Sequence, residues 1–202
     1  DPFEYRGIRD YQPQDDLKSI NWKATARTGD LKVNQKNYTA RKSVRIFVNL
    51  EDTGILKKED CVEACLQIAA ALLLLFLEQG MQVALYCNGI DITSGEPCIL
   101  EAGGGVRQLN AALQALARID TSRPVLPFPE LFASRLIDTA NTIYTCFVSP
   151  NAYDDFASLL LQYQEQHRDM KWFYPYSEST PPDPGEALKS LITFISLREE
   201  SV

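Results

Sequence analysis

Short runs of β-branched and aromatic residues alternate with helix-length segments from residue 43 onward. The runs lie at 43–50, 81–87, 141–149 and 170–174, and helices are expected at 58–79, 106–119, 130–138, 153–167 and 185–197. Strands separated by helices need crossover connections, which join parallel neighbours in one sheet. The alternation therefore predicts an α/β fold, a Rossmann-like three-layer sandwich with a mostly parallel central sheet covered on both faces.

The region between the second strand and the next helix is rich in turn-forming residues. Asn88-Gly89 and the run from Asp91 to Gly95 predict turns, and residues 97–100 predict a short edge strand. Three glycines at 103–105 are expected to open the helix at 106–119. They lack the spacing of a phosphate-binding loop, so we interpret them as a helix entry.

Residues 1–42 precede this alternation and are expected to form an N-terminal extension packed on the α/β domain of residues 43–202. Residues 1–45 hold ten Lys/Arg against six Asp/Glu, a balance of +4, whereas the remainder holds ten against twenty-one, a balance of −11. Asp15 and Asp16 are expected to cap a short helix that runs through Trp22 and ends at Gly29. We expect the mixed charges to pair with one another and fold the segment onto the domain edge.

The cysteines and the apolar runs bear on compartment and membrane insertion. Five cysteines without a CxxC pair indicate reduced thiols and a cytoplasmic location. The longest apolar run, residues 68–77, is ten residues long, well short of the roughly 20 that span a bilayer, and predicts a buried helix. Because the chain starts at Asp1 and not at Met, we expect it to be a piece of a longer protein.

Candidate catalytic groups are sparse. His167 is the single histidine and lies in a polar segment, so neither a Ser-His-Asp triad nor a zinc site is predicted. Cys61 and Cys65 share a helix face and are interpreted as core residues. These observations favour a non-enzymatic protein.

One loop could hold a divalent cation. Glu51, Asp52 and Thr53 follow the first strand, at the sheet edge where open α/β sheets bind ligands, and their oxygens are suitable ligands for Mg²⁺. The competing interpretation is that these side chains cap a helix. The first interpretation leaves open a divalent-metal-dependent binding protein or hydrolase.

The basic balance of the extension raises the question of nucleic acid binding. Tyr5, Tyr11, Trp22 and Tyr38 could stack on bases, and such binding would weaken steeply with salt. Acidic side chains are interleaved throughout the segment, which favours internal ion pairs. We therefore predict no nucleic-acid partner.

The residue string of the extension resembles the signature of the bacterial domain-of-unknown-function 58 family. The matching pattern is Gly7-x-Arg9-x-Tyr11-x-x-x-Asp15, Ile20-x-Trp22-Lys23-x-Thr25-Ala26-Arg27 and Leu31-x-Val33. The resemblance implies that a von Willebrand factor A-like domain follows the signature. It also implies a protein partner, a MoxR-type AAA+ ATPase, and a parent protein anchored at the cytoplasmic face of the inner membrane.

The resemblance also implies where a metal would bind, and the sequence departs from that pattern. Von Willebrand A domains use an Asp-x-Ser-x-Ser loop, whereas this chain reads Asn49-x-Glu51-x-Thr53 or Glu51-x-Thr53-x-Ile55, depending on the alignment. A glycine run replaces the expected Thr, and Ser149-Pro150-Asn151 supplies no Asp. We therefore expect a degenerate site without a cofactor. The leading hypothesis is a protein-interaction domain whose signature residues are Gly7, Arg9, Tyr11, Asp15, Trp22, Lys23 and Arg27.

Overall fold

The computed structural model describes most of the chain as two compact units. The described residues are 4–12, 15, 20–37, 43–52, 58–123, 125–135, 142–151, 154–166, 169–183 and 185–198. Contacts within the chain divide it into Asp1–Arg41 and Lys42–Val202, the signature unit and the α/β unit. The predicted packing of the first on the second stays a prediction.

The signature unit contains a two-stranded antiparallel sheet and one helix. The sheet pairs β1 (Glu4–Asp10) with β2 (Lys32–Asn37), and α1 (Trp22–Thr28) lies between them in sequence. Val33 is buried and Ile20 forms an isolated bridge to it, so these two side chains make a small apolar centre. Strand β1 was not predicted, because its polar sequence has no alternating apolar pattern.

The short helix α1 forms where the sequence predicted it, but a different residue caps its start. The Asn21 side chain accepts a hydrogen bond from Ala24 N at 2.9 Å, and Asp15 instead bonds elsewhere. At the other end Gly29 adopts a left-handed conformation with φ 82°, which closes the helix as glycine commonly does.

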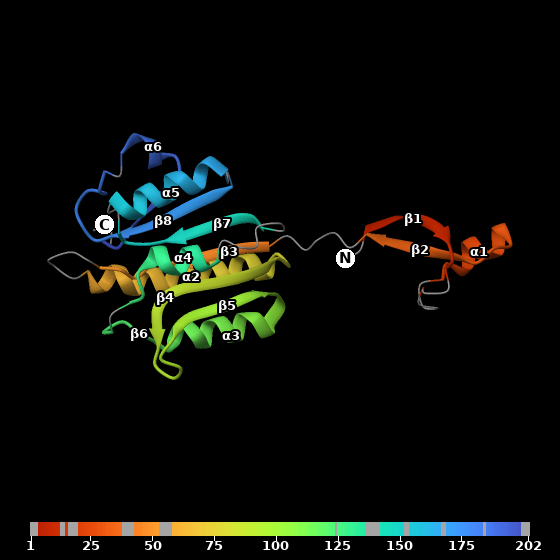
Figure 1. The fold of residues 1–202 in the computed structure, drawn as a ribbon, viewed down its shortest axis with the longest axis horizontal. Coiled ribbons are helices and arrows are strands. Elements are labelled where there is room, and N and C mark those ends of the chain that lie inside the picture. Colours follow the sequence, from red (N-terminus) through yellow and green to blue (C-terminus); the bar gives the residue numbers. More distant parts are fainter. Residues whose placement is uncertain are drawn as a thin grey trace. The chain divides into compact units, whose positions relative to one another are not determined.

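The α/β unit contains a seven-stranded sheet in the order β5-β4-β3-β7-β8-β9, with β6 paired to β4 (Figure 1). Strands β3, β4, β7, β8 and β9 run parallel, and β5 and β6 pair antiparallel to β4. The strands are β3 (Ser43–Val48), β4 (Gln82–Asp91), β5 (Pro97–Gly103), β6 (Ile119–Asp120), β7 (Thr142–Val148), β8 (Met170–Tyr176) and β9 (Ile192–Ser196). The helices are α2 (Glu59–Glu78), α3 (Gly105–Ala117), α4 (Phe128–Arg135), α5 (Asp154–Gln166) and α6 (Glu186–Lys189).

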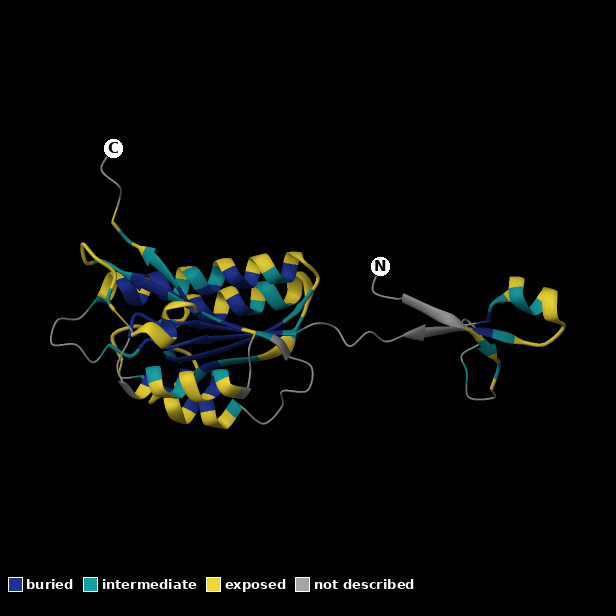
Figure 2. Cartoon of the chain, turned by 90° about the horizontal axis from the view of Figure 1, so that it is seen from above, coloured by how far each residue is buried: buried dark blue, intermediate teal, exposed yellow. Residues whose placement is uncertain are grey.

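Helices cover both faces of this sheet, as the alternation predicted. Figure 2 shows helices above and below a sheet of mainly buried residues. Helices α2 and α3 pack with Val44, Ile46 and Val48 in an aliphatic core. Helices α4, α5 and α6 contribute to an aromatic core on the other face, around Phe47 and Phe147, whose rings stack 5.5 Å apart. The result is the predicted three-layer α/β sandwich.

Two predicted elements are wrong. Asn88-Gly89 is not a turn, because β4 continues to Asp91 and its end pairs with β5 and β6. The predicted helix at 185–197 is a four-residue helix, α6, followed by β9. The sequence Ile-Thr-Phe-Ile-Ser favours a strand, and this strand pairs in parallel with the outer edge of β8.

The longest helix, α2, meets the length and composition of a membrane-spanning segment. Among the described residues it is the one helix that does so, with a mean hydropathy of 2.0. Half of its most apolar stretch is buried in the structure, and Cys65, Ala69 and Leu73 on that side belong to the aliphatic core. The helix is therefore a core element, as the sequence predicted.

Candidate functional site

Arg9 and Asp15 are joined in the signature unit. The guanidinium donates from Nη1 to Oδ2 at 2.7 Å and from Nη2 to Oδ1 at 2.6 Å, the bidentate arrangement that Arg and a carboxylate favour. Asp15 also accepts from Gln12 N at 2.8 Å. The Arg9 hydrogen bond, followed by that from Gln12, lowers the pKa of Asp15 below its ordinary value. This carboxylate thus ties the segment after β1 back to the strand.

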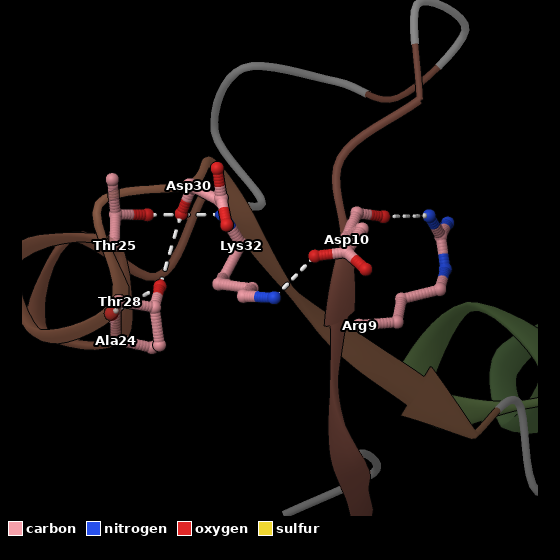
Figure 3. Close-up of polar contacts among 7 residues, drawn as sticks. All are labelled: Arg9, Asp10, Ala24, Thr25, Thr28, Asp30 and Lys32. Carbon is pink, nitrogen blue, oxygen red and sulfur yellow. Dashed lines mark hydrogen bonds and ion pairs between the residues drawn. The ribbon is translucent and has the colours of Figure 1, made fainter.

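A second set of bonds fixes α1 against β2 (Figure 3). The Lys32 amide donates to Thr25 Oγ1 at 3.0 Å, and the Lys32 ammonium forms an ion pair with Asp10 on β1. Thr28 Oγ1 donates to Ala24 O at 3.1 Å within the helix. The two strands and the helix are thereby held in one arrangement without a large apolar core.

The remaining signature residues differ in how far they reach solvent. Trp22 begins α1, and its side chain is 67% exposed. Lys23 and Arg27, also exposed, lie four residues apart on the same helix and hence on one face. Helix α1 therefore presents one indole and two cations.

Two further signature positions have structural roles. The Tyr11 amide donates to Leu31 O at 2.9 Å, extending the contact between the chain segments that follow β1 and precede β2. Gly7 lies where the pairing of β1 with β2 shifts register, between Tyr5 and Gly7, a position at which glycine is common. The signature thus combines bracing residues with an exposed helix.

The second region of interest is the carboxyl edge of the parallel sheet. Asn49 and Asn88 are fully buried after β3 and within β4. Asn88 Nδ2 donates to Asn49 Oδ1 at 2.9 Å and to Leu126 O at 3.1 Å, and Asn88 Oδ1 accepts from Leu50 N at 2.8 Å. This network joins two strands to the segment that leads into α4.

The predicted metal ligands are engaged with backbone amides. Glu51 Oε1 accepts from Phe128 N at 3.0 Å, at the start of α4, and Asp52 Oδ2 accepts from Lys58 N at 2.5 Å, at the start of α2. Thr53 lies outside the described residues. Across the described ranges no group of three or more His, Cys, Asp or Glu side chains could hold a metal ion. The geometry favours the capping interpretation, and the expected absence of a bound metal stays a prediction.

A cavity of about 510 Å³ opens beside this loop. Its lining combines apolar side chains with three carboxylates and one guanidinium, that of Arg123, which is paired with Asp120 at 3.0 Å. An acidic lining of this kind favours cationic groups over anions. The lining residues are Leu50, Asp52, Glu59, Val62, Glu63, Thr121, Ser122, Arg123 and Val125.

The thiols are not poised as nucleophiles. All five cysteines are buried and free, and burial raises the pKa of Cys98 to about 11 and that of Cys146 to about 12. The thiolate is the reactive form of cysteine, so such thiols are inert at neutral pH. His167 lies outside the described residues.

The sequence did not predict the roles of three sets of polar residues. Asn88 was assigned to a turn, and its buried role could not be read from the Asn-Gly pair. The bracing pair of Asp10 and Lys32 is separated by a helix in the sequence. Arg45 was passed over as well, although a charge inside the apolar run of residues 43–50 was a visible signal.

A comparison with protein-family models agrees with the signature resemblance. A comparison with curated proteins gave no match. The family model described as "Protein of unknown function DUF58" matches residues 7–126, which include the whole signature, the first parallel strands and more than half of the 202 residues. The resemblance stated from the sequence is thereby confirmed: the chain belongs to the DUF58 family of proteins of unknown function.

Proposed function

We propose that this chain is a protein-interaction module whose contact surface is the exposed face of α1. The observation that carries the proposal is Trp22, which is 67% exposed at the start of a helix that the rest of the unit holds firmly. Large exposed aromatics beside cations are typical of interface hot spots. Two other apolar side chains of the unit are exposed as well, Ile8 and Leu31.

The bracing around α1 supports this function. A surface binds more tightly when its shape is set before the partner arrives, because less conformational freedom is lost on association. The bidentate Arg9–Asp15 pair and the bond from the Lys32 amide to Thr25 set that shape. The signature pattern therefore contains both the contact residues and the residues that orient them.

We infer that the partner presents an acidic surface with an apolar pocket for the indole. Lys23 and Arg27 supply positive charge beside Trp22, and complementary charge speeds encounter and fixes orientation.

The resemblance stated above suggests a MoxR-type AAA+ ATPase as the partner. It also suggests the cytoplasmic face of the inner membrane as the place of contact and a von Willebrand A-like character for the α/β unit. The strand order supports that character, because it is the 3-2-1-4-5-6 order of doubly wound sheets.

The test is a titration of the 202-residue chain with the MoxR-type ATPase of the same genome, in which calorimetry measures the heat of binding. Trp22→Ala combined with Lys23→Glu should weaken binding at least about 30-fold, because hot-spot residues each contribute 2 kcal/mol or more. The matched control is Val106→Ala with Arg107→Glu, an exposed apolar and basic pair on α3, which should bind as the parent does. Equal affinity of the two double variants would refute the proposal.

A further inference from the structure

A buried positive charge lies on the face of the sheet that carries the aromatic core, without a counter-charge among the described residues. Arg45, on the central strand β3, is 6% exposed, and its Nη1 atom is buried without a hydrogen-bond partner. Among the described residues, no carboxylate forms an ion pair with it. A guanidinium removed from water normally has a paired acceptor, because an unpaired one destabilises the fold.

A second guanidinium lies beside the same tyrosine. Arg45 is two residues before Phe47 and shares its face of the sheet, and the Phe47 ring packs 5.1 Å from the Tyr86 ring. From the end of α4, Arg135 places its guanidinium carbon 5.8 Å from the centre of that Tyr86 ring. Its Nε atom is also buried without a hydrogen-bond partner. Burial, followed by the Glu101 carboxylate, raises the pKa of Tyr86, and the positive charges of Arg45 and Arg135 oppose that rise.

The Glu101 carboxylate lies near Tyr86, and each of its oxygens accepts a hydrogen bond. Glu101 Oε1 accepts from Arg135 Nη1 at 3.0 Å, and Glu101 Oε2 accepts from the Tyr86 hydroxyl at 3.1 Å. Glu101 thus balances Arg135, and the charge of Arg45 remains. Arg135 therefore lies over the Tyr86 ring, and Arg45 lies on the same face of the sheet. Each guanidinium has a buried nitrogen without a hydrogen-bond partner, and among the described residues Glu101 is the one carboxylate paired with this group.

We propose that Arg45 and Arg135 bind a small oxyanion, a carboxylate or phosphate group, beside Tyr86. Guanidinium N–H groups are the donors that such anions favour. The rim of the site reaches solvent, because the side chains of Glu101 and Arg135 are 70% and 31% exposed. The near burial of Arg45 limits the occupant to a single small group. This anion site, defined by Arg45, Tyr86, Glu101 and Arg135, is independent of the α1 surface.

Thermal unfolding of the whole chain tests the site. Sodium phosphate and sodium acetate are each compared with sodium chloride at equal ionic strength. Binding to the folded state raises the melting temperature in a saturable way, by about 3 to 6 °C for a tenfold excess over Kd in a chain of this size. A response to phosphate alone assigns phosphate groups, a response to acetate alone assigns carboxylates, and a response to neither overturns the proposal.

Arg45→Met and the control Arg107→Met separate this site from general salt effects. Arg107 is exposed on α3, so its variant should keep the response, whereas Arg45→Met should lose it. In chloride, Arg45→Met should be at least as stable as the parent, because it removes a buried unpaired charge. A large loss of stability there would show that Arg45 has a partner within the chain and would overturn the proposal.

A direct readout covers the case in which Arg45→Met fails to fold. In the unaltered chain, the Nε–H signals of Arg45 and Arg135 should shift on titration with phosphate or acetate, and that of Arg107 should stay in place. Arg135→Lys keeps a charge near Glu101 but removes the Nε–H donor, so its half-saturation concentration should rise several-fold. Unmoved Nε–H signals of Arg45 and Arg135 would exclude binding at this place.

Discussion

Arg9 and Asp15 lie six residues apart and form a bidentate ion pair, with both carboxylate oxygens within 2.7 Å of a guanidinium nitrogen. The Asp15 side chain is 14% exposed, whereas that of Arg9 is 39% exposed. The pair therefore fixes the chain that follows β1 before α1 begins. It also accounts for the presence of both residues in the signature without assigning either a reaction.

The pair predicts a pH dependence of the signature unit. The Arg9 hydrogen bond lowers the pKa of Asp15 in the folded chain, so the stabilising contribution is present above the unfolded-state pKa of Asp15. It is lost as the pH falls through the lower, folded value. A carbon-detected NMR titration of Asp15 should show that Arg9→Lys moves the pKa upward. An identical pKa in the parent and in Arg9→Lys would contradict the role of the ion pair.

Truncation of the two tryptophans should change the free energy of unfolding by very different amounts. Trp172 is fully buried, its Nε1 donates to Ser149 O at 3.1 Å, and its ring meets Phe156 edge-on at 5.1 Å. Trp172→Ala should lower the free energy of unfolding by about 3 to 5 kcal/mol. Trp22→Ala should change it by less than about 0.5 kcal/mol, because the ring is exposed. Urea unfolding, monitored by circular dichroism, measures the free-energy change of both variants.

The fluorescence of single-tryptophan variants is the control, because it reports whether each indole is exposed to water. In Trp22→Phe the emission comes from Trp172 and should lie at short wavelength, because its indole is shielded from water. In Trp172→Phe the emission comes from Trp22 and should lie near that of free indole in water, with strong quenching by iodide. A blue-shifted, unquenched Trp22 would mean that its ring is covered in solution, and the α1 surface would then not be free to bind.

Asn88→Ala should destabilise the α/β unit. The change removes the acceptor of Leu50 N and the donor to both Asn49 Oδ1 and Leu126 O. Buried groups left without partners cost about 1 to 3 kcal/mol, and chemical denaturation should show a loss of that size. Asn110→Ala, at an exposed position of α3, is the control and should change stability by less than about 0.5 kcal/mol. Equal effects at the two positions would contradict the buried network.

Gly89 should not tolerate a methyl group. A Cβ atom there would lie 2.6 Å from Ile119 Cγ2 and 2.8 Å from Leu50 Cδ1, so Gly89→Ala should cost about 1 to 3 kcal/mol through overpacking. At Gly104 the backbone is extended and a Cβ atom would lie 3.7 Å from Met81 O. Gly104→Ala is therefore a matched control that should be close to neutral. Differential scanning calorimetry of the two variants checks the difference.

The sequence predicted the sheet well where a strand is buried on both faces. The run at 43–50 and helix 58–79 correspond closely to β3 (Ser43–Val48) and α2 (Glu59–Glu78), because apolar periodicity and the Gly80 stop are local signals. It failed at β1, at the end of β4 and at β9. Those elements are strands because a partner strand supplies hydrogen bonds, and a partner cannot be read from local residues.

For the candidate site, the sequence by itself determined the family, through the spacing of Gly7, Arg9, Asp15 and Trp22, and the mostly parallel α/β sheet. The tertiary structure decided how those residues are used. Arg9 pairs with Asp15, Trp22 faces solvent, and Glu51 caps a helix. The structure also decided that Arg45 lies buried on the sheet face that carries Tyr86, without a partner carboxylate among the described residues. Burial and pairing depend on segments far apart in the chain, and the residue pattern carries no distance between such segments.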